Sequence, residues 1–228
     1  MIKIYGINIS EELDNKIYNI FLNLISPEKQ NRIKRFRFFQ DAQRCLLGDI
    51  LVRYAICKNL DIDNDLLKFS SNEYGKPFLL KPKDFYFNIS HSGDWVVCAV
   101  GNKPLGVDVE LIKTIDYNIA KRFFSKDEFN DLLKIDKEKR LEYFYKLWTL
   151  KESYIKAEGK GLSIPLNTFS FKIKKDDIKI FSQKELKPYF FWQHKLYENY
   201  ILSLCSLKKL DKECIEIVSL SQLLNYMV

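Results

Sequence analysis

The first third of the chain alternates between strand-like and helix-like patterns of apolar residues. Residues 2–9 have apolar side chains at the spacing of a strand, and residues 11–25 and 41–58 have them at the spacing of a helix. Between the two helical stretches, Ser26-Pro27 has the composition of a helix start. These residues predict a strand followed by several helices.

Turns and strands dominate from residue 69. A turn is predicted at residues 72–77, and strands at 85–89 and 95–100 are joined by the polar turn 90–93, so they form a hairpin. Residues 105–111 predict a further strand.

Helical spacing returns at residues 119–134 and 139–158, and strand-like runs follow at 169–174 and 199–207. The order of helices, hairpin and strand therefore occurs about twice. We predict an α+β fold of two similar halves, residues 1–103 and 104–228, each with a small antiparallel sheet packed with helices.

Composition narrows the class of protein without naming a function. Of the 228 residues, 46% are hydrophobic and 29% charged, which is the balance of a folded soluble protein. The net charge of +7 favours anionic partners, but the 37 basic residues are interspersed with 30 acidic ones. This dispersion argues against a dedicated nucleic-acid binder.

The sequence shows no recognisable targeting signal, and this together with the pattern of its cysteines predicts a cytoplasmic protein. No signal-peptide pattern begins the chain, and no run of about 18 apolar residues predicts a membrane span. The five cysteines form no C-x-x-C pair, and only two histidines accompany them. Free thiols in a reducing compartment are the simplest interpretation.

Two carboxylates lie at alternate positions of the predicted strand 105–111. Asp108 and Glu110 point to one face while Val107 and Val109 point into the core. For this segment alone, an ordinary half-exposed strand with two solvated acids is the simpler interpretation. A third carboxylate is needed to predict a metal site.

The predicted helix 139–158 offers that third carboxylate. Trp148, Glu152 and Lys156 share one face of this helix, away from its apolar stripe. A surface ion pair between Glu152 and Lys156 is the alternative. Three carboxylates with a nearby lysine suit magnesium bound to a phosphorylated substrate, because Mg²⁺ prefers carboxylate and phosphate oxygens.

Several polar groups outside this cluster are candidate phosphate ligands. Ser90 and His91 lie in the predicted turn 90–93, whose backbone N–H groups also suit a phosphate. Lys29, Arg32 and Arg44 lie on the predicted helices near the N-terminus. For each of these residues, a solvated polar surface is the simpler interpretation when the residue is considered alone.

Ser125 and Glu128 have the spacing of a capping box, S-x-x-E. This structural role for Glu128 stands beside a catalytic one. The second histidine, His194, lies in a polar stretch and is expected at the surface.

Together these motifs resemble the signatures of the surfactin-synthetase-activating type of 4′-phosphopantetheinyl transferase. The resemblance covers about residues 1–169, in segments at residues 25–29, 46–53, 73–77, 87–92, 106–110, 124–126 and 148–156. It implies transfer of phosphopantetheine from coenzyme A to a serine of an acyl, peptidyl or polyketide carrier protein, with release of 3′,5′-ADP. It also implies that the two halves are related by a pseudo-two-fold axis, with coenzyme A in the cleft between them.

The same resemblance implies residue roles. Asp108, Glu110 and Glu152 would hold Mg²⁺, Lys156 would contact the diphosphate, and Glu128 would be the general base, with Trp148 also in the catalytic group. Coenzyme A would be bound by Lys29, Arg32, Arg44 and His91 at the 3′-phosphate, by Tyr74, Gly75, Lys76 and Ser90 at the adenine, and by Lys151 and Lys156.

The carrier protein is expected to dock near residues 111–124 through Ile112, Ile115, Phe123 and Phe124. We expect a monomer without nucleic-acid or membrane partners. Two alternatives remain open: a non-catalytic module for a nucleotide or nucleic acid, and another magnesium-dependent transferase that uses coenzyme A.

Overall fold

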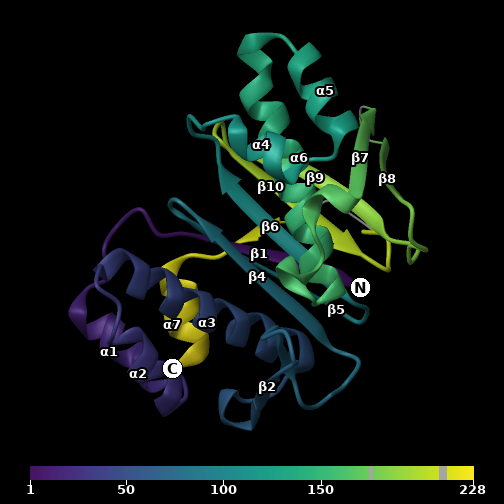
Figure 1. Cartoon of the computed structure of the whole chain (residues 1–228). Helices are drawn as coiled ribbons and strands as arrows, with labels where there is room; N and C mark the ends of the chain where they lie inside the picture. Colours follow the sequence, from purple (N-terminus) through teal and green to yellow (C-terminus); the bar gives the residue numbers. More distant parts are fainter. Residues whose placement is uncertain (175–176, 211–214) are drawn as a thin grey trace.

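The computed structural model describes residues 1–174, 177–210 and 215–228. The chain folds as a mixed α+β protein around two sheets, and helices pack on each (Figure 1). Cys45, Cys57, Cys98 and Cys205 are free thiols, as predicted, and Cys214 lies outside the described residues. No helix in the described part of the chain is long and apolar enough to cross a membrane.

The first sheet has four strands in the order β11-β1-β5-β4. These are Ile215–Ile217, Ile2–Asn8, Trp95–Gly101 and Tyr86–Ser92. The long helix α3, Phe39–Leu60, packs on this sheet with α1, Asn15–Asn23, and α2, Pro27–Ile33, beside it (Figure 1). Leu46, Ile50 and Leu51 of α3 are fully buried in the resulting core.

The second sheet has three strands in the order β6-β10-β9. These are Leu105–Leu111, Tyr200–Ser206 and Phe190–Leu196. Helix α6, Lys137–Glu158, packs on it, and the shorter α4, Asn118–Phe123, and α5, Lys126–Lys134, cover the far side of α6 (Figure 1). Two small hairpins complete the fold, formed by β2, Phe69–Ser71, with β3, Pro77–Leu79, and by β7, Phe169–Lys174, with β8, Asp177–Ser182.

The structure differs from the predicted elements in three places. Residues 90–92 continue strand β4 and pair with β5, so the turn is confined to Gly93 and Asp94. The predicted helix 119–134 is broken into α4 and α5, because Ser125 leaves the helix to cap α5. The chain also returns to the first sheet through β11 and then α7, Leu220–Met227, which packs on α3. The last residues of the predicted second half therefore join the first core.

A glycine brings α6 unusually close to β6. A Cβ on Gly106 would lie 2.1 Å from the carbonyl oxygen of Ser153 and 2.4 Å from the backbone nitrogen of Ala157. These atoms belong to the helix backbone and cannot move aside as a flexible side chain would. The contact therefore requires glycine, and it sets the helix directly over the strand that carries Asp108 and Glu110.

Short polar side chains join the two sheets where the edge strands β4 and β6 meet. Three β6 backbone N–H groups donate to alternate side chains of β4: Val107 to Asn88 at 2.8 Å, Val109 to Ser90 at 3.3 Å, and Leu111 to Ser92 at 3.2 Å. We call these three pairs the seam. Side chains of β4 thus accept the edge N–H groups of β6 that a neighbouring strand would otherwise bind. The seam also places two β4 hydroxyls, those of Ser90 and Ser92, beside the carboxylates of β6.

Candidate active site

A cavity of about 270 Å³ lies between α2, α3 and the β2–β3 hairpin. Four of the predicted phosphate ligands, Lys29, Arg32, Arg44 and His91, line it together with Gly75. The lining also includes the apolar side chains of Phe69, Pro77, Phe87 and Ile89, which we call the apolar wall. Cations together with apolar surface in one cavity match a phosphorylated base.

Two of the cations in this cavity, Lys29 and Arg44, are held by protein partners. Lys29 forms an ion pair with Asp49, which also accepts a hydrogen bond from Arg53 at 2.9 Å. Arg44 donates to the Gly93 carbonyl at 3.0 Å and to Asp41 at 2.6 Å. These bonds fix the directions of the side chains before any anion is present.

Partial burial and the positive charges of Lys156 and Arg44 lower the pKa of His91. A bound phosphate would oppose the effect of those charges, so protonation of His91 and anion binding favour each other. His91 follows Ser90 on β4, and this places the cavity next to the acidic cluster described below.

Asp108 is the centre of the acidic cluster. The residue is 3% exposed, and Oδ1 accepts from Lys156 Nζ at 2.5 Å and from Ser90 Oγ at 2.8 Å. Oδ2 is buried and has no hydrogen-bond partner within the described residues. Burial raises the pKa of Asp108, and Lys156 opposes this shift.

Glu110 and Glu152 complete the cluster. Ser92 Oγ donates to Glu110 Oε2 at 2.6 Å, and burial together with the charge of Asp108 raises the pKa of Glu110. Burial and the charge of Asp108 raise the pKa of Glu152 to about 7. The structure thus brings together the three carboxylates and the lysine that the sequence predicted for one site.

The cluster is not a preformed metal centre. Within residues 1–174, 177–210 and 215–228, no group of three or more His, Cys, Asp or Glu side chains is arranged so that it could hold a metal ion. The donor set nevertheless suits a hard cation, since it consists of carboxylates whose negative charge is poorly compensated and one of whose oxygens has no partner.

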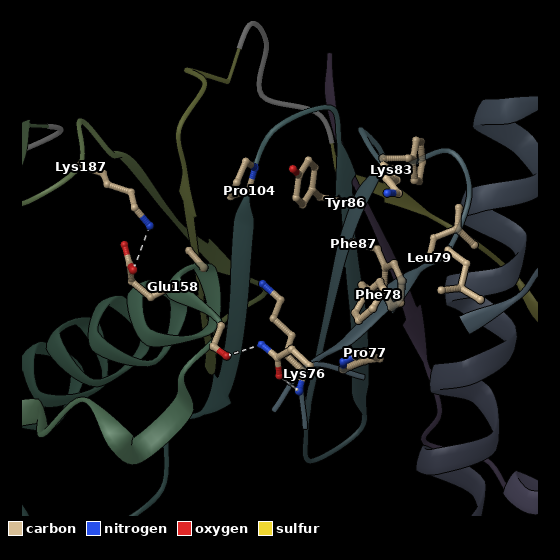
Figure 2. Close-up of a pocket in the computed structure, with 15 residues that line it drawn as sticks. Lys76, Pro77, Phe78, Leu79, Lys83, Tyr86, Phe87, Pro104, Glu158 and Lys187 are labelled. Carbon is tan, nitrogen blue, oxygen red and sulfur yellow. Dashed lines mark hydrogen bonds and ion pairs between the residues drawn. The ribbon is translucent and has the colours of Figure 1, made fainter. Parts of the chain in front are cut away.

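The loop of residues 72–76 contributes one wall of the cavity and a contact with α6. Tyr74 is 46% exposed, and Gly75 lines the cavity with a φ of 83°. The Lys76 side chain instead points between the two halves (Figure 2). Its ammonium group donates to the carbonyls of Leu105 at 3.0 Å and Lys156 at 2.5 Å. Its predicted contact with the adenine stays a prediction.

Glu128 and Lys151 form an ion pair inside the second core. Their side chains are 1% and 0% exposed, with Lys151 Nζ 2.8 Å from Glu128 Oε2. Glu128 also accepts from the backbone N–H groups of Ser125, at 2.9 Å, and Phe171, at 2.8 Å. Lys151 donates to the carbonyls of Leu166 and Phe169 as well.

This pairing confirms the capping box predicted for Ser125 and Glu128. A direct part for Glu128 as general base, or for Lys151 in coenzyme A binding, stays a prediction. In this conformation both side chains would have to leave the core to take such a part.

Trp148 and the predicted docking segment lie beside the second core. The Trp148 ring stacks on Phe144 with centroids 5.7 Å apart and meets the edge of Phe123 at 5.8 Å. Ile112, Ile115 and Phe123 are half-buried, whereas Phe124 is buried and stacks on Phe144. Phe124 therefore supports the core in this structure and leaves the other three as candidate contacts.

Three residues that support the cavity and the acidic cluster were not predicted individually. Asn88 and Ser92 belong to the seam, and Asn72 organises the loop that contains Tyr74 and Lys76. A signal for the first two is present in the sequence: Asn88, Ser90 and Ser92 place short polar groups on one face of the strand, and they alternate with Phe87 and Ile89 on the other.

Comparisons with known proteins identify the family. Residues 14–103 match the 4′-phosphopantetheinyl transferase N-terminal family, and residues 104–205 match the 4′-phosphopantetheinyl transferase superfamily. Among solved structures, the holo-[acyl-carrier-protein] synthase of Thermotoga maritima is similar over 46% of this chain and 63% of its own, with 20% identity and a TM-score of 0.40.

Curated relatives match over most of the chain. The 4′-phosphopantetheinyl transferase Sfp of Bacillus subtilis is 43% identical over 97% of this chain and 100% of its own length. The transferase gsp of Aneurinibacillus migulanus is 40% identical, covering 91% of this chain and 86% of its own. The L-aminoadipate-semialdehyde dehydrogenase-phosphopantetheinyl transferase of Mus musculus is 31% identical, covering 78% and 66%. This chain belongs to the 4′-phosphopantetheinyl transferase superfamily.

Proposed function

We propose that this protein transfers the 4′-phosphopantetheine group of coenzyme A to a serine of an apo carrier protein. The observation that carries the proposal is the placement of a cation-lined cavity directly beside a carboxylate–lysine cluster, in a chain of this superfamily. The cavity suits the phosphorylated nucleoside of coenzyme A, and the cluster suits its diphosphate.

The nucleotide end of coenzyme A would occupy the cavity. Lys29, Arg32, Arg44 and His91 would surround the 3′-phosphate, and the adenine would lie against Gly75 and the apolar wall. Tyr74, beside Gly75, would extend this surface. With its nucleotide end held there, the substrate would place its diphosphate near Ser90 and Lys156. The Lys156 Nζ and Ser90 Oγ atoms are 3.1 Å apart.

Asp108, Glu110 and Glu152 would hold the magnesium ion. The unpartnered oxygen of Asp108 and the raised pKa of Glu152 both indicate a site that gains stability from a cation. When bound, Mg²⁺ supplies neutralisation of the charge on the diphosphate oxygens. Lys156 would contribute the same kind of stabilisation from the protein.

The transfer forms one oxygen–phosphorus bond and breaks another. The serine oxygen attacks the phosphorus next to pantetheine, the bond from this phosphorus to the bridging oxygen breaks, and 3′,5′-ADP leaves with that oxygen. The serine proton passes to a carboxylate. Glu128 is the predicted base; it is enclosed in this conformation and would have to leave the core to accept that proton.

The carrier protein would dock beside the cluster, on the half-buried side chains of Ile112, Ile115 and Phe123. Carrier proteins are typically acidic, so the net charge of +7 favours their encounter at low salt. We extend the proposal to a cytoplasmic monomer whose halves, residues 1–103 and 104–228, are related by a pseudo-two-fold axis, with β11 and α7 of the second half returning to the first sheet. In support, each half packs a helix of 22 residues on its sheet.

The test is intact-mass analysis of apo acyl and peptidyl carrier proteins after incubation with coenzyme A and this protein, with MgCl₂ or with EDTA. We expect a gain of one phosphopantetheine on serine, with 3′,5′-ADP formed only when carrier and magnesium are both present. Release of 3′,5′-ADP without a carrier indicates another transferase. Salt-dependent nucleic-acid binding without any transfer supports a non-catalytic module.

A further inference from the structure

The loop that borders the nucleotide cavity is built around one side chain. Asn72 Oδ1 accepts from the backbone N–H groups of Tyr74 at 3.0 Å and Lys76 at 2.8 Å. The Asn72 backbone N–H donates to the Lys76 carbonyl at 3.0 Å, and Gly75 N–H donates back to Asn72 at 2.9 Å. The two donors on Oδ1 fix the orientation of the amide, so its Nδ2 points away from the loop.

Two groups on the outer side of this loop reach across to the second half. Asn72 Nδ2 donates to the Gly159 carbonyl at 2.8 Å, and Lys76 Nζ donates to the Lys156 carbonyl. Lys76 also bonds Leu105, the first residue of β6. Burial between the halves lowers the pKa of Lys76 to about 8.

The end of α6 is a suitable acceptor for these donors. The last carbonyls of a helix have no partner within the helix and carry the negative end of its dipole. Gly159 ends α6 with a φ of 74°, and a Cβ there would lie 3.3 Å from Asn72 Nδ2 and 3.2 Å from Lys76 Cδ. Glycine therefore both ends the helix and lets the loop approach it.

These contacts link the nucleotide cavity to the acidic cluster. On one side, Gly75 and Pro77 line the cavity. On the other, the Lys156 carbonyl is held by Lys76 while its own side chain contacts Ser90 and Asp108. A displacement of the loop therefore displaces the turn of α6 that carries Lys156.

From this geometry we infer that Asn72 is a positioning residue: with Lys76 it clasps the C-terminal end of α6 to the nucleotide loop, so that binding of the nucleotide sets the position of Lys156. The inference rests on the proposed function of the cavity and the cluster. A displacement of about 1 Å in a catalytic group can cost ~10²-fold in rate, so the clasp acts on turnover more than on nucleotide affinity.

The variant Asn72→Asp tests the hydrogen bond to Gly159 without removing the hydrogen bonds inside the loop. The carboxylate still accepts from Tyr74 and Lys76, but it presents an oxygen to the Gly159 carbonyl and a negative charge to the negative end of α6. We expect kcat for transfer to an apo carrier protein to fall roughly 10- to 100-fold. The Kd of 3′,5′-ADP, measured by calorimetry, should change much less than kcat.

The matched control is Lys187→Met. Lys187 pairs with Glu158 at 3.0 Å, so this change removes a charge from the same helix end without touching the first half (Figure 2). We expect its kcat to stay near that of the unaltered protein. A second clasp variant, Lys76→Met, should lower kcat as Asn72→Asp does. If Lys76→Met instead weakens 3′,5′-ADP binding and leaves kcat unchanged, Lys76 is a nucleotide contact and the clasp is refuted.

Hydrogen exchange of the unaltered protein tests the same link without transfer and without a variant. We expect 3′,5′-ADP to slow the exchange of amides at residues 158–161 as well as at 72–77. If 3′,5′-ADP leaves the amide exchange rates at residues 158–161 unchanged, the inference is overturned. Absence of transfer by the unaltered protein would instead count against the proposed function.

Discussion

Helix α6 carries two lysines that pair with carboxylates from other elements, and the two pairs differ in nearly every respect. Lys151 and Glu128 are completely enclosed, and every oxygen of the carboxylate has a partner. Lys156 and Asp108 lie at the joint of the two halves, the lysine side chain is 26% exposed, and Asp108 keeps one oxygen unpartnered.

The difference separates an ion pair that supports the fold from an ion pair that belongs to the proposed metal site. Buried charges with all partners in place rigidify their surroundings, and loss of one partner is costly. Charges left with spare capacity beside two further carboxylates mark a place where binding a cation lowers the free energy. Only four residues of one helix separate the two lysines.

The largest expected effect comes from breaking the enclosed pair. Glu128→Gln removes the negative charge opposite Lys151, and a buried unpaired ammonium costs about 3–5 kcal/mol of the free energy of unfolding. Thermal denaturation should show a melting temperature lower by roughly 10 °C.

The double variant Glu128→Gln with Lys151→Met controls for this, because it removes both charges and should recover much of the loss. If Glu128→Gln keeps its melting temperature and loses ~10²–10⁴-fold in turnover, Glu128 is the general base as the sequence predicted.

Breaking the open pair should affect turnover instead. Asp108→Ala removes a proposed magnesium ligand and the partner of Lys156, and we expect turnover to fall at least ~10²-fold. The melting temperature should change less than for Glu128→Gln, because Lys156 can reach water. Asp131→Ala, which breaks a surface pair with Lys172, should keep normal turnover. Normal transfer by Asp108→Ala at saturating magnesium would refute the metal assignment.

Removing a charge from the open cluster should stabilise the protein while impairing it. Glu152 has a folded pKa of about 7 against 4.5 for its ordinary value, so the folded state holds its proton more tightly. The free energy of unfolding therefore falls as pH rises from about 4.5 to about 7, and Glu152→Gln escapes this loss.

Chemical denaturation in EDTA should show Glu152→Gln to be more stable by about 1–2 kcal/mol at pH 8, less than the full pKa difference because Glu152 is partly exposed. The advantage should vanish near pH 4, while turnover at pH 8 falls. An equal advantage at both pH values would show that charge is not its cause.

The smallest effect concerns the seam. Ser92→Ala leaves the Leu111 N–H and Glu110 without their partner, and we expect turnover to fall about 5- to 10-fold, the scale of one ordinary hydrogen bond. Ser92→Thr keeps the hydroxyl and should retain most of the activity. Equal rates for the two variants would show that the hydroxyl does not orient Glu110.

Local patterns were sufficient to predict much of the site. Strand β6 occupies the predicted residues 105–111, and its period of two places Asp108 and Glu110 on one face. The helical period likewise places Glu152 and Lys156 together, and the structure sets them beside Asp108. Each of these inferences uses residues within one element.

Contacts between distant elements were not predictable from such patterns. Asn72 meets Gly159 across 87 residues, and Glu128 meets Phe171 across 43. The periods of helix and strand do not encode which elements pack together. The sequence predicts a turn at residues 90–93 for the same reason: Ser90 and Ser92 have the pattern of solvated residues, and only the packing of β6 against β4 shows their partners.

A joint made of side chains can be altered one residue at a time. A backbone ladder between β4 and β6 would be indifferent to sequence, whereas this seam depends on the length and chemistry of three side chains spaced two residues apart. The two hydroxyls of the seam, on Ser90 and Ser92, also bond Asp108 and Glu110. A mutation that loosens the joint therefore also reorients these carboxylates. Selection on catalysis and selection on the cohesion of the two halves therefore act here on the same few codons.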